Sequence, residues 1–461
     1  MSGISARKRI WGWWFFDWAS QPYNTLILTF IFGPYFAETV RGILIEGGME
    51  VEAAKAQAQA YWGYGLTASG ILIAVLAPIL GAFADSTGRR MPWVWFFSAL
   101  YVLGSAALWY TAPDQFDITR TLIFFGIGLI GMEFATIFTN SMLPTLGDRH
   151  EIGRISGSGW AFGYIGGVIA LAIMLLLFQA GESGNTMLGI PPILGLDPAT
   201  GADTRAVAPL TALWYVAFMI PFFLWVRDVN DPDHVPYKFG TALKDLGGTL
   251  RALPNHPSLL AYLGSSMFYR DALNGMYTFG GIYASGVLNW PIMKIGIFGI
   301  IGALTGALFA WIGGKADKAF GPKPVIVTCI LILLATAVTI IMITPQSVLG
   351  FAVAPGSSLP DIAFFVCGGL IGAAGGAIQS ASRTMVVWQS NPARMTEAFG
   401  LYALSGKATT FLAPMLIAIA SDLSGSQRIG IMPVAGLFLV GLILLIWVKA
   451  EGDKEKWSVS P

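Results

Sequence analysis

Six ionisable side chains interrupt stretches of this sequence that are otherwise apolar. They are Asp17, Glu133, Arg270, Asp271, Arg383 and Lys407. A charge at the centre of a lipid-facing helix costs at least about 2.5 kcal/mol, so these groups must face a cavity, a partner or an interface. A cavity with both acidic and basic groups suits a zwitterion, because its carboxylate and its ammonium group each meet an opposite charge. The residue types therefore predict a binding site for a small zwitterionic solute.

Glu133 is the strongest candidate for a proton carrier, since a lone buried carboxyl group can be neutral in one state and charged in another. Asn140 lies two turns further along the same apolar run. Asp271 is comparably deep in its own run and is a candidate for the proton or for the ammonium group of a solute. The alternative is that Glu133 forms a structural ion pair with Lys407 or Arg270.

Arg270 and Arg383 are the candidates for binding a solute carboxylate. Arg383 lies near the end of its run, so its side chain could instead snorkel to the membrane surface. Asp17 lies among several tryptophans, and an aromatic belt at the membrane interface is the alternative role there. Tyr23 could cover a cationic group by a cation–π contact, or it could serve only in helix packing.

A short charged turn occurs twice, about half the chain apart, as GAFADSTGRR from Gly81 and GGKADKAFGPK from Gly313. The predicted gating residues are Gly81, Asp85, Gly88, Arg89 and Arg90 in the first copy and Gly313, Asp317, Gly321 and Lys323 in the second. The glycines permit close helix contacts and sharp reversals. Each Asp is placed to accept a hydrogen bond from the N-terminus of a facing helix, whose dipole favours an anion. The alternative is that such loops collect Gly and basic residues for topology alone.

The elements that must position these residues are membrane-spanning helices. Hydrophobic residues make up 55% of the 461 residues and charged residues 11%, against roughly 25% charged residues in soluble domains. Apolar runs of about 20 residues predict an all-α integral membrane protein with twelve transmembrane helices. Their ranges are 11–40, 61–84, 93–112, 119–144, 155–180, 210–227, 257–286, 291–313, 324–343, 360–388, 396–420 and 428–449.

These helices are expected to form two pseudo-symmetric six-helix bundles. The predicted regions are 1–227, a cytoplasmic linker at 228–256, and 257–461 with a short cytoplasmic tail. TNSM from Thr139 and SRTM from Ser382 are further corresponding motifs, which indicates parallel repeats related by an axis along the membrane normal. Lys and Arg concentrate in the cytoplasmic connections if both termini are cytoplasmic, as the positive-inside rule requires.

Other classes of protein are disfavoured. A net charge of +1 argues against a nucleic-acid surface, and the chain has no GxxxxGK[ST] loop for ATP hydrolysis. No Ser-His-Asp or Cys-His arrangement stands out, so the protein is not expected to be an enzyme. Cys329 and Cys367 lie in apolar runs and the three histidines are far apart. No metal, cofactor or disulfide framework is therefore expected. The protein is expected to be a monomer.

Four motifs support a resemblance to a known family. They are FFDWASQPYNT from Phe15, GRISGSGWAFGYIGG from Gly153, FYRDALN from Phe268 and FGLYALSGK from Phe399. With the doubled turn, the whole chain resembles the major facilitator superfamily, and more closely the "unknown major facilitator" family related to the fungal vacuolar amino-acid effluxer linked to autophagy. It departs from that family's usual pattern at Ser20, Gln21 and Ala272.

The resemblance implies that helices 1, 4, 7 and 10 line a central cavity, and all the in-helix charges except Lys407 lie on these helices. It also implies that the doubled turn latches the cytoplasmic side shut while the site opens outward.

We therefore predict a secondary active transporter of the bacterial inner membrane that moves an amino-acid-like solute by alternating access, coupled to protons, and we expect efflux from the resemblance. One alternative is a facilitative uniporter. Another is a non-transporting assembly factor that handles a lipid or pigment, with an apolar cavity that opens sideways to lipid. A membrane-embedded enzyme would need a clustered nucleophile or metal set, which the sequence does not show.

Overall fold

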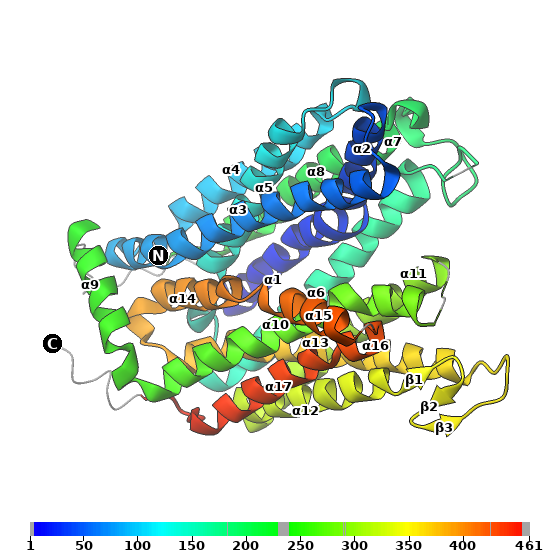
Figure 1. Ribbon diagram of the computed structural model, residues 1–461. Helices are drawn as coiled ribbons and strands as arrows, with labels where there is room; N and C mark the ends of the chain where they lie inside the picture. Colours follow the sequence, from blue (N-terminus) through cyan, green and yellow to red (C-terminus); the bar gives the residue numbers. More distant parts are fainter. Residues whose placement is uncertain are drawn as a thin grey trace. The chain divides into compact units, whose positions relative to one another are not determined.

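The computed structural model describes residues 4–181, 183–228, 239–288, 290, 292–424 and 426–453, and most of them are helical (Figure 1). Contacts between residues divide the chain into two compact units. The first unit comprises Met1–Leu76, Gly88–Thr139 and Phe162–Asp231, and the second comprises Ala77–Thr87, Asn140–Ala161 and Pro232–Pro461. Two short segments from the first half of the sequence thus belong to the unit built by the second half. The boundaries near 228 and 256 stay a prediction, and residues 229–238 of the predicted linker lie outside the described residues.

The first unit is built from helices that pack through glycines. Its helices are α1 (Ala6–Pro22), the π-helix Tyr23–Phe30, α2 (Phe32–Glu46), most of α3 (Val51–Thr87), α4 (Met91–Ala107), α5 (Ile118–Ser141), the later part of α6 (Arg149–Ile173), the π-helix Met174–Phe178, α7 (Ala202–Arg205) and α8 (Val207–Trp225). A Cβ atom added at Gly104 of α4 would lie 2.3 Å from the backbone nitrogen of Gly128 in α5. Only glycine permits that backbone approach.

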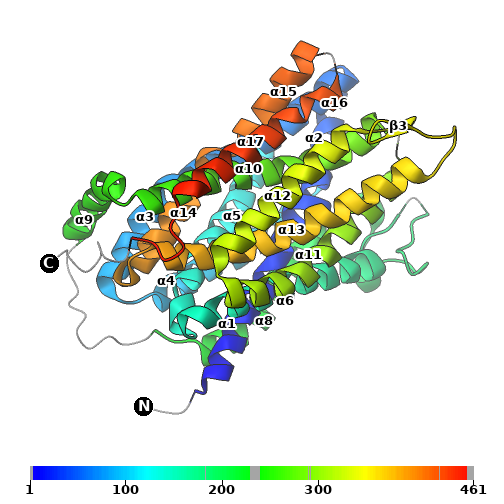
Figure 2. The ribbon, with the colours of Figure 1, turned by 90° about the horizontal axis from the view of Figure 1, so that it is seen from below.

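The second unit contains the remaining helices and a small sheet. Its elements are α9 (Phe239–Ala252), α10 (Pro257–Gly286), α11 (Ile292–Phe320), α12 (Pro322–Ile341), β1 (Ile343–Thr344), β2 (Ser347–Val348), β3 (Phe351–Ala352), α13 (Leu359–Gln389), α14 (Met395–Ala408), α15 (Leu412–Ser424), α16 (Gln427–Gly430) and α17 (Met432–Leu444). The strands form an antiparallel sheet in the order β1-β2-β3. Helices α11 and α12 both pack on α13, and Figure 2 shows α12 and α13 side by side. Gly372 of α13 lies against the carbonyl oxygen of Gly302, where an added Cβ would be 2.1 Å away.

The predicted transmembrane helices are largely confirmed as helices. Ten helices within the described residues are long and apolar enough to cross a membrane, and they overlap ten of the predicted ranges. The seventh predicted range, 257–286, is helix α10, whose polar residues weaken its apolar character. The range 396–420 differs, because the structure breaks it into α14 and α15 at residues 409–411.

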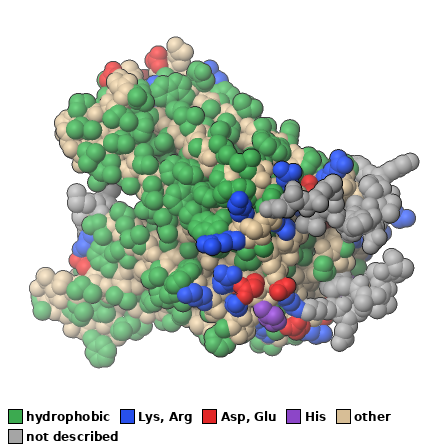
Figure 3. All heavy atoms as spheres, turned by 180° about the vertical axis from the view of Figure 1, so that it is seen from behind, with side chains coloured by type: hydrophobic (Ala, Val, Ile, Leu, Met, Phe, Trp, Pro, Cys, Tyr) green, Lys and Arg blue, Asp and Glu red, His purple; other side chains and the backbone are tan. Residues whose placement is uncertain are grey.

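The surface and the thiols fit a chain that is solvated by lipid. Large apolar side chains such as Ile71, Leu103 and Leu213 are exposed on the spanning helices. Hydrophobic side chains also cover much of the face drawn in Figure 3, where charged side chains gather in a limited area. A soluble protein would not leave apolar surface of this extent uncovered. Cys329 of α12 and Cys367 of α13 are free thiols, and both are buried.

Candidate functional site

The first charged turn ends α3, and its Asp85 binds a helix N-terminus in the second unit. Asp85 is 5% exposed, and its Oδ2 accepts a hydrogen bond from the backbone N–H of Glu397, 2.8 Å away. Glu397 is the third residue of α14, a position whose N–H has no acceptor within its own helix. A Cβ atom added at Gly81 would lie 2.7 Å from the carbonyl oxygen of Thr396. The hydrogen bond expected for Asp85 is therefore present, and Gly81 makes the close approach possible.

The second turn meets its facing helix differently. Asp317 of α11 is 2% exposed and lies against Gly153 of α6, where an added Cβ would be 2.5 Å from the carboxyl carbon. Within the described part of the chain neither oxygen of Asp317 has a hydrogen-bond partner by geometry, although the Thr384 side chain is close enough to act on it. Gly153 is the fifth residue of α6, so its N–H is already used inside the helix. The predicted hydrogen bond to a helix N-terminus is thus absent at Asp317.

Ion pairs and close backbone contacts surround the second turn. Lys318 forms an ion pair with Glu151, which also pairs with Arg154 at 2.7 Å. Gly314 packs on Gly157, where an added Cβ would lie 2.6 Å from the Cα of Gly314. This turn is therefore held by packing and by exposed charges at its rim.

The remaining gating candidates have mainly backbone roles. Gly88 and Gly321 have positive φ values of 64° and 82°, which glycine adopts without strain. Lys323 donates a hydrogen bond to the carbonyl oxygen of Val448.

The backbone that follows Gly88 is held by an acidic residue that the sequence did not single out. The backbone N–H groups of Arg90 and Met91 donate to the carboxylate of Asp228, at 2.9 Å for Arg90. Asp228 thereby caps the N-terminus of α4. Gly313, in the second turn, lies against Ala377 of α13.

Asp271 of α10 faces the break between α14 and α15, where the predicted range 396–420 is interrupted. Its Oδ2 accepts a hydrogen bond from the backbone N–H of Ala413 at 2.7 Å, and Ala413 is the second residue of α15. The side chain is 2% exposed, and its Oδ1 has no hydrogen-bond partner in the described part of the chain. A buried carboxylate is thus satisfied on one oxygen and not on the other.

Arg270 points toward α14. It donates to the carbonyl oxygen of Tyr402 at 3.0 Å, and its guanidinium lies 4.2 Å from the centre of the Tyr402 ring. A Cβ atom added at Gly406 would lie 2.4 Å from this guanidinium, so the glycine makes room for it. Lys407 is half-buried in the last turn of α14. Two basic side chains thus lie on or against the end of α14.

Arg383 and Asn140 are polar residues of the second unit. Arg383 of α13 is 5% exposed, and its guanidinium lies 5.1 Å from the centre of the Trp160 ring. That burial argues against snorkelling. The side-chain oxygen of Asn140 is buried and lacks a hydrogen-bond partner among the described residues.

Asp17, Tyr23 and Glu133 lie in the first unit. Asp17 of α1 is buried close to Gly163 of α6. The hydroxyl of Tyr23 donates to the carbonyl oxygen of Phe125 at 2.6 Å, and its ring packs on Tyr101. Since the hydroxyl is already satisfied, this geometry favours the packing role of Tyr23. Glu133 of α5 is half-buried.

Among the predicted site residues, the second unit thus contains Asn140, Arg270, Asp271, Arg383 and Lys407. Sequence reasoning missed Glu397, Tyr402 and Trp160, whose contacts depend on which helices face each other. The FGLYALSGK motif contains Tyr402 and was a signal for it. No group of metal-binding side chains was found among the described residues.

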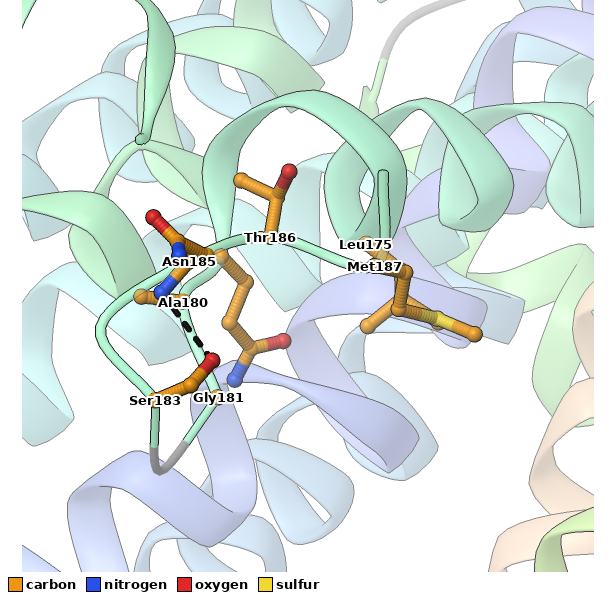
Figure 4. A pocket seen from close by; sticks show the side chains of 8 residues that line it. Leu175, Ala180, Gly181, Ser183, Asn185, Thr186 and Met187 are labelled. Atoms are coloured by element: carbon orange, nitrogen blue, oxygen red, sulfur yellow. Dashed lines mark hydrogen bonds between the residues drawn. The ribbon is translucent and has the colours of Figure 1, made fainter. Parts of the chain in front are cut away.

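A cavity of about 410 Å³ opens in the long connection after α6 (Figure 4). It is lined by Leu175, Gln179, Ala180, Gly181, Ser183, Asn185, Thr186 and Met187. The backbone N–H of Asn185 donates to the hydroxyl of Ser183 at its edge. None of the predicted site residues lines it, and its described lining bears no charge, so it does not fit a zwitterion.

Comparison with other sequences places this chain in a family. The sequence profile described as "Vacuole effluxer Atg22 like" matches residues 5–457. An uncharacterized MFS-type transporter of Bacillus subtilis, YxiO, is 24% identical over 439 residues, which cover 95% of this chain and 94% of that protein. Autophagy-related protein 22-1 of Aspergillus niger is 24% identical over 67% of this chain, and the match spans 49% of the fungal protein.

Solved structures show the same fold. The proton:xylose symporter XylE aligns with a TM-score of 0.71 and 10% identity over 98% of this chain and 99% of the symporter. The human organic anion transporter MFSD10 aligns with a TM-score of 0.68 and 17% identity over 96% and 100% of the two chains. The predicted fold class is therefore confirmed, and the protein is an integral membrane transporter. The chain belongs to the Atg22-like vacuole effluxer family, within the major facilitator superfamily.

Proposed function

We propose that the protein is a proton-coupled secondary transporter that moves a small amino-acid-like zwitterion across the bacterial inner membrane by alternating access. The observation that carries this proposal is the burial of opposite charges on membrane helices of one unit. Asp271 of α10 and Arg383 of α13 are both at least nine-tenths buried. Such charges are expensive in a membrane and are retained where they bind solutes or ions.

Each candidate has a chemical role in this proposal. Arg383 and Arg270 bind the solute carboxylate, since a guanidinium can make a bidentate contact with a carboxylate, and the two guanidinium groups lie against the rings of Trp160 and Tyr402. Glu133 and Asp271 take the proton or the ammonium group. Asp17, Asn140 and Lys407 are further candidates for polar contacts.

The two charged turns gate one side of the membrane in this proposal. Their support is that Gly81 and Gly314 make backbone contacts too close for any larger residue, which suits surfaces that meet and separate as rigid bodies. The protein acts as a monomer with both termini in the cytoplasm.

The test is uptake of labelled solutes into liposomes that contain the purified protein. We expect amino acids to accumulate when a pH gradient is imposed and not when it is absent. Glu133→Gln should abolish accumulation, because a neutral amide carries no proton. Glu38→Gln is the matched control, since Glu38 is exposed and pairs only locally with Arg41.

Three outcomes would contradict the proposal. Accumulation by Glu133→Gln would remove the proton role of Glu133. Equilibration of solute that ignores the gradient would indicate a facilitative uniporter. Uptake of lipids or sugars in preference to amino acids would exclude a zwitterion site.

A further inference from the structure

The break between α14 and α15 is caused by a proline, Pro414. Pro414 has no N–H, and its ring would clash with the carbonyl of Thr410 if the helix ran through without interruption. The chain instead makes a turn in which the N–H of Leu412 donates to the carbonyl of Thr409 at 2.8 Å. A new helix of 13 residues then begins at Leu412, and its first N–H groups have no acceptor within the helix.

Helix α10 holds this new N-terminus. Asp271 accepts from the N–H of Ala413 at 2.7 Å, and Thr409 donates to the carbonyl of Met267, one turn earlier on α10, at 3.3 Å. One turn later, Gly275 lets α15 approach, since an added Cβ there would lie 3.1 Å from the Cβ of Ala413. The position of α15 therefore depends on a carboxylate that faces the positive end of a helix dipole.

The second oxygen of Asp271 is the unexplained group. Oδ1 is buried and has no hydrogen-bond partner, and Asp271 forms no ion pair in the described part of the chain. Arg270, its sequence neighbour, is turned to Tyr402 on α14. The other charged residues on elements packed against α10 are Lys294, Lys315, Asp317 and Lys318 on α11, Lys323 on α12, Asp361 and Arg383 on α13, Glu397 and Lys407 on α14, Asp422 on α15 and Arg428 on α16.

We propose that Asp271 Oδ1 binds a coupling proton and that its protonation loosens the first turn of α15. The inference rests on the proposed function, in which Glu133 and Asp271 are both proton carriers, and it places the proton of Asp271 on one atom. A proton from solution adds to the carboxylate, and no covalent bond is broken. The hydrogen bond from Ala413 then loses its charge assistance, and the helix dipole loses its anion. Deprotonation restores both and docks α15 on α10 again.

A proton fits this atom better than a metal ion does. Sodium and calcium need several oxygen ligands around them, and the described residues contain no cluster of acidic, His or Cys side chains. A proton needs a single lone pair, which Oδ1 offers. Asp271 thereby acts on the position of α15, and a solute contact is not required for this role.

Hydrogen exchange of the backbone amides tests the inference without a solute. The full chain in lipid nanodiscs is labelled at low and at high pH, and rates are corrected for the intrinsic pH dependence of exchange. We expect protection of residues 410–416 to fall about threefold to tenfold at low pH, as the loss of a charge–dipole interaction implies. Asp271→Asn should be equally unprotected at both pH values, whereas Asp271→Glu keeps a titratable group and should keep the pH response.

Asp453→Asn is the matched control. Asp453 accepts from the N–H of Ser258 at 2.9 Å and so caps α10 as Asp271 caps α15. That variant should change protection near residue 258 and leave the pH response at 410–416 intact.

Protection at 410–416 that does not depend on pH in the wild-type chain would overturn the inference, even if Asp271→Asn fails to fold. So would a change in protection when Na⁺ replaces choline at constant pH. Failure of amino-acid uptake would count against the proposed solute alone, because the exchange measurement needs no solute.

Discussion

The two copies of the charged turn look alike in sequence and meet their facing helices in different ways. Asp85 meets α14 at its third residue, where a backbone N–H is free to donate. Asp317 meets α6 at its fifth residue, Gly153, where the N–H is already used. The same side chain is therefore a helix cap in one copy and a buried carboxyl group without a backbone donor in the other.

The difference separates two contributions that a repeated motif combines. A carboxylate at a helix N-terminus is worth roughly 0.3–2 kcal/mol, and only the first turn has this term. Close glycine packing is present in both turns, at Gly81 and at Gly314. If both turns gate the transporter, close glycine packing is the feature that both turns require, and the helix cap is a feature of the first turn alone.

The largest expected effect comes from filling the glycine contacts. Gly81→Val and Gly314→Val should each reduce liposome uptake by about tenfold or more, because overpacking against backbone costs about 1–3 kcal/mol. The added Cβ atoms would lie 2.7 Å and 2.8 Å from the carbonyl oxygens of Thr396 and Gly153. Gly70→Val on α3 is the control, since nothing lies within 4 Å of a Cβ there. A loss confined to one turn would break the shared requirement.

An intermediate effect is expected from neutralising the two acids. Asp85→Asn should lower the free energy of unfolding by about 1 kcal/mol, because it removes a charge-assisted bond to a helix N-terminus. Asp317→Asn should leave the free energy of unfolding unchanged or raise it, since a buried carboxyl group without a backbone donor is costly. Thermal unfolding of both variants in one detergent measures the difference. Shifts of the same sign and size would show that the two carboxyl groups have equivalent surroundings.

The smallest effect is expected at the rim of the second turn. Lys318 and Glu151 form an ion pair, and their side chains are 45% and 30% exposed. Exposed ion pairs contribute about 0–1 kcal/mol. Lys318→Gln should therefore change the free energy of unfolding by less than about 1 kcal/mol and should leave solute uptake near the wild-type rate. Uptake that falls as far as in Gly314→Val would mean that charge, and not packing, closes this turn.

Much of the fold could be predicted from the sequence, because apolar run length and the repeated turn are local patterns. The environment of Asp317 could not, since it depends on where the facing helix begins. A 3₁₀ turn at Pro392–Arg394 delays the start of α14 to Met395, whereas α6 is already helical from Arg149.

The candidate site was predictable only in part. The sequence marked Asp271 and Arg383 as costly charges, but their partners Ala413 and Trp160 are ordinary residues in apolar runs. Pro414 is visible in the sequence and indicates the break between α14 and α15. Its consequence, a free helix N-terminus that faces Asp271, required the packing of α15 on α10.

The burial of Cys329 and Cys367 makes the native chain a ready background for site-directed labelling. Thiols enclosed in helix contacts react slowly with maleimides, because a reagent must reach the sulfur. A single cysteine introduced on an exposed position such as Phe411 would react first. Fluorescent reporters can therefore test the proposed loosening of α15 without removing either natural thiol.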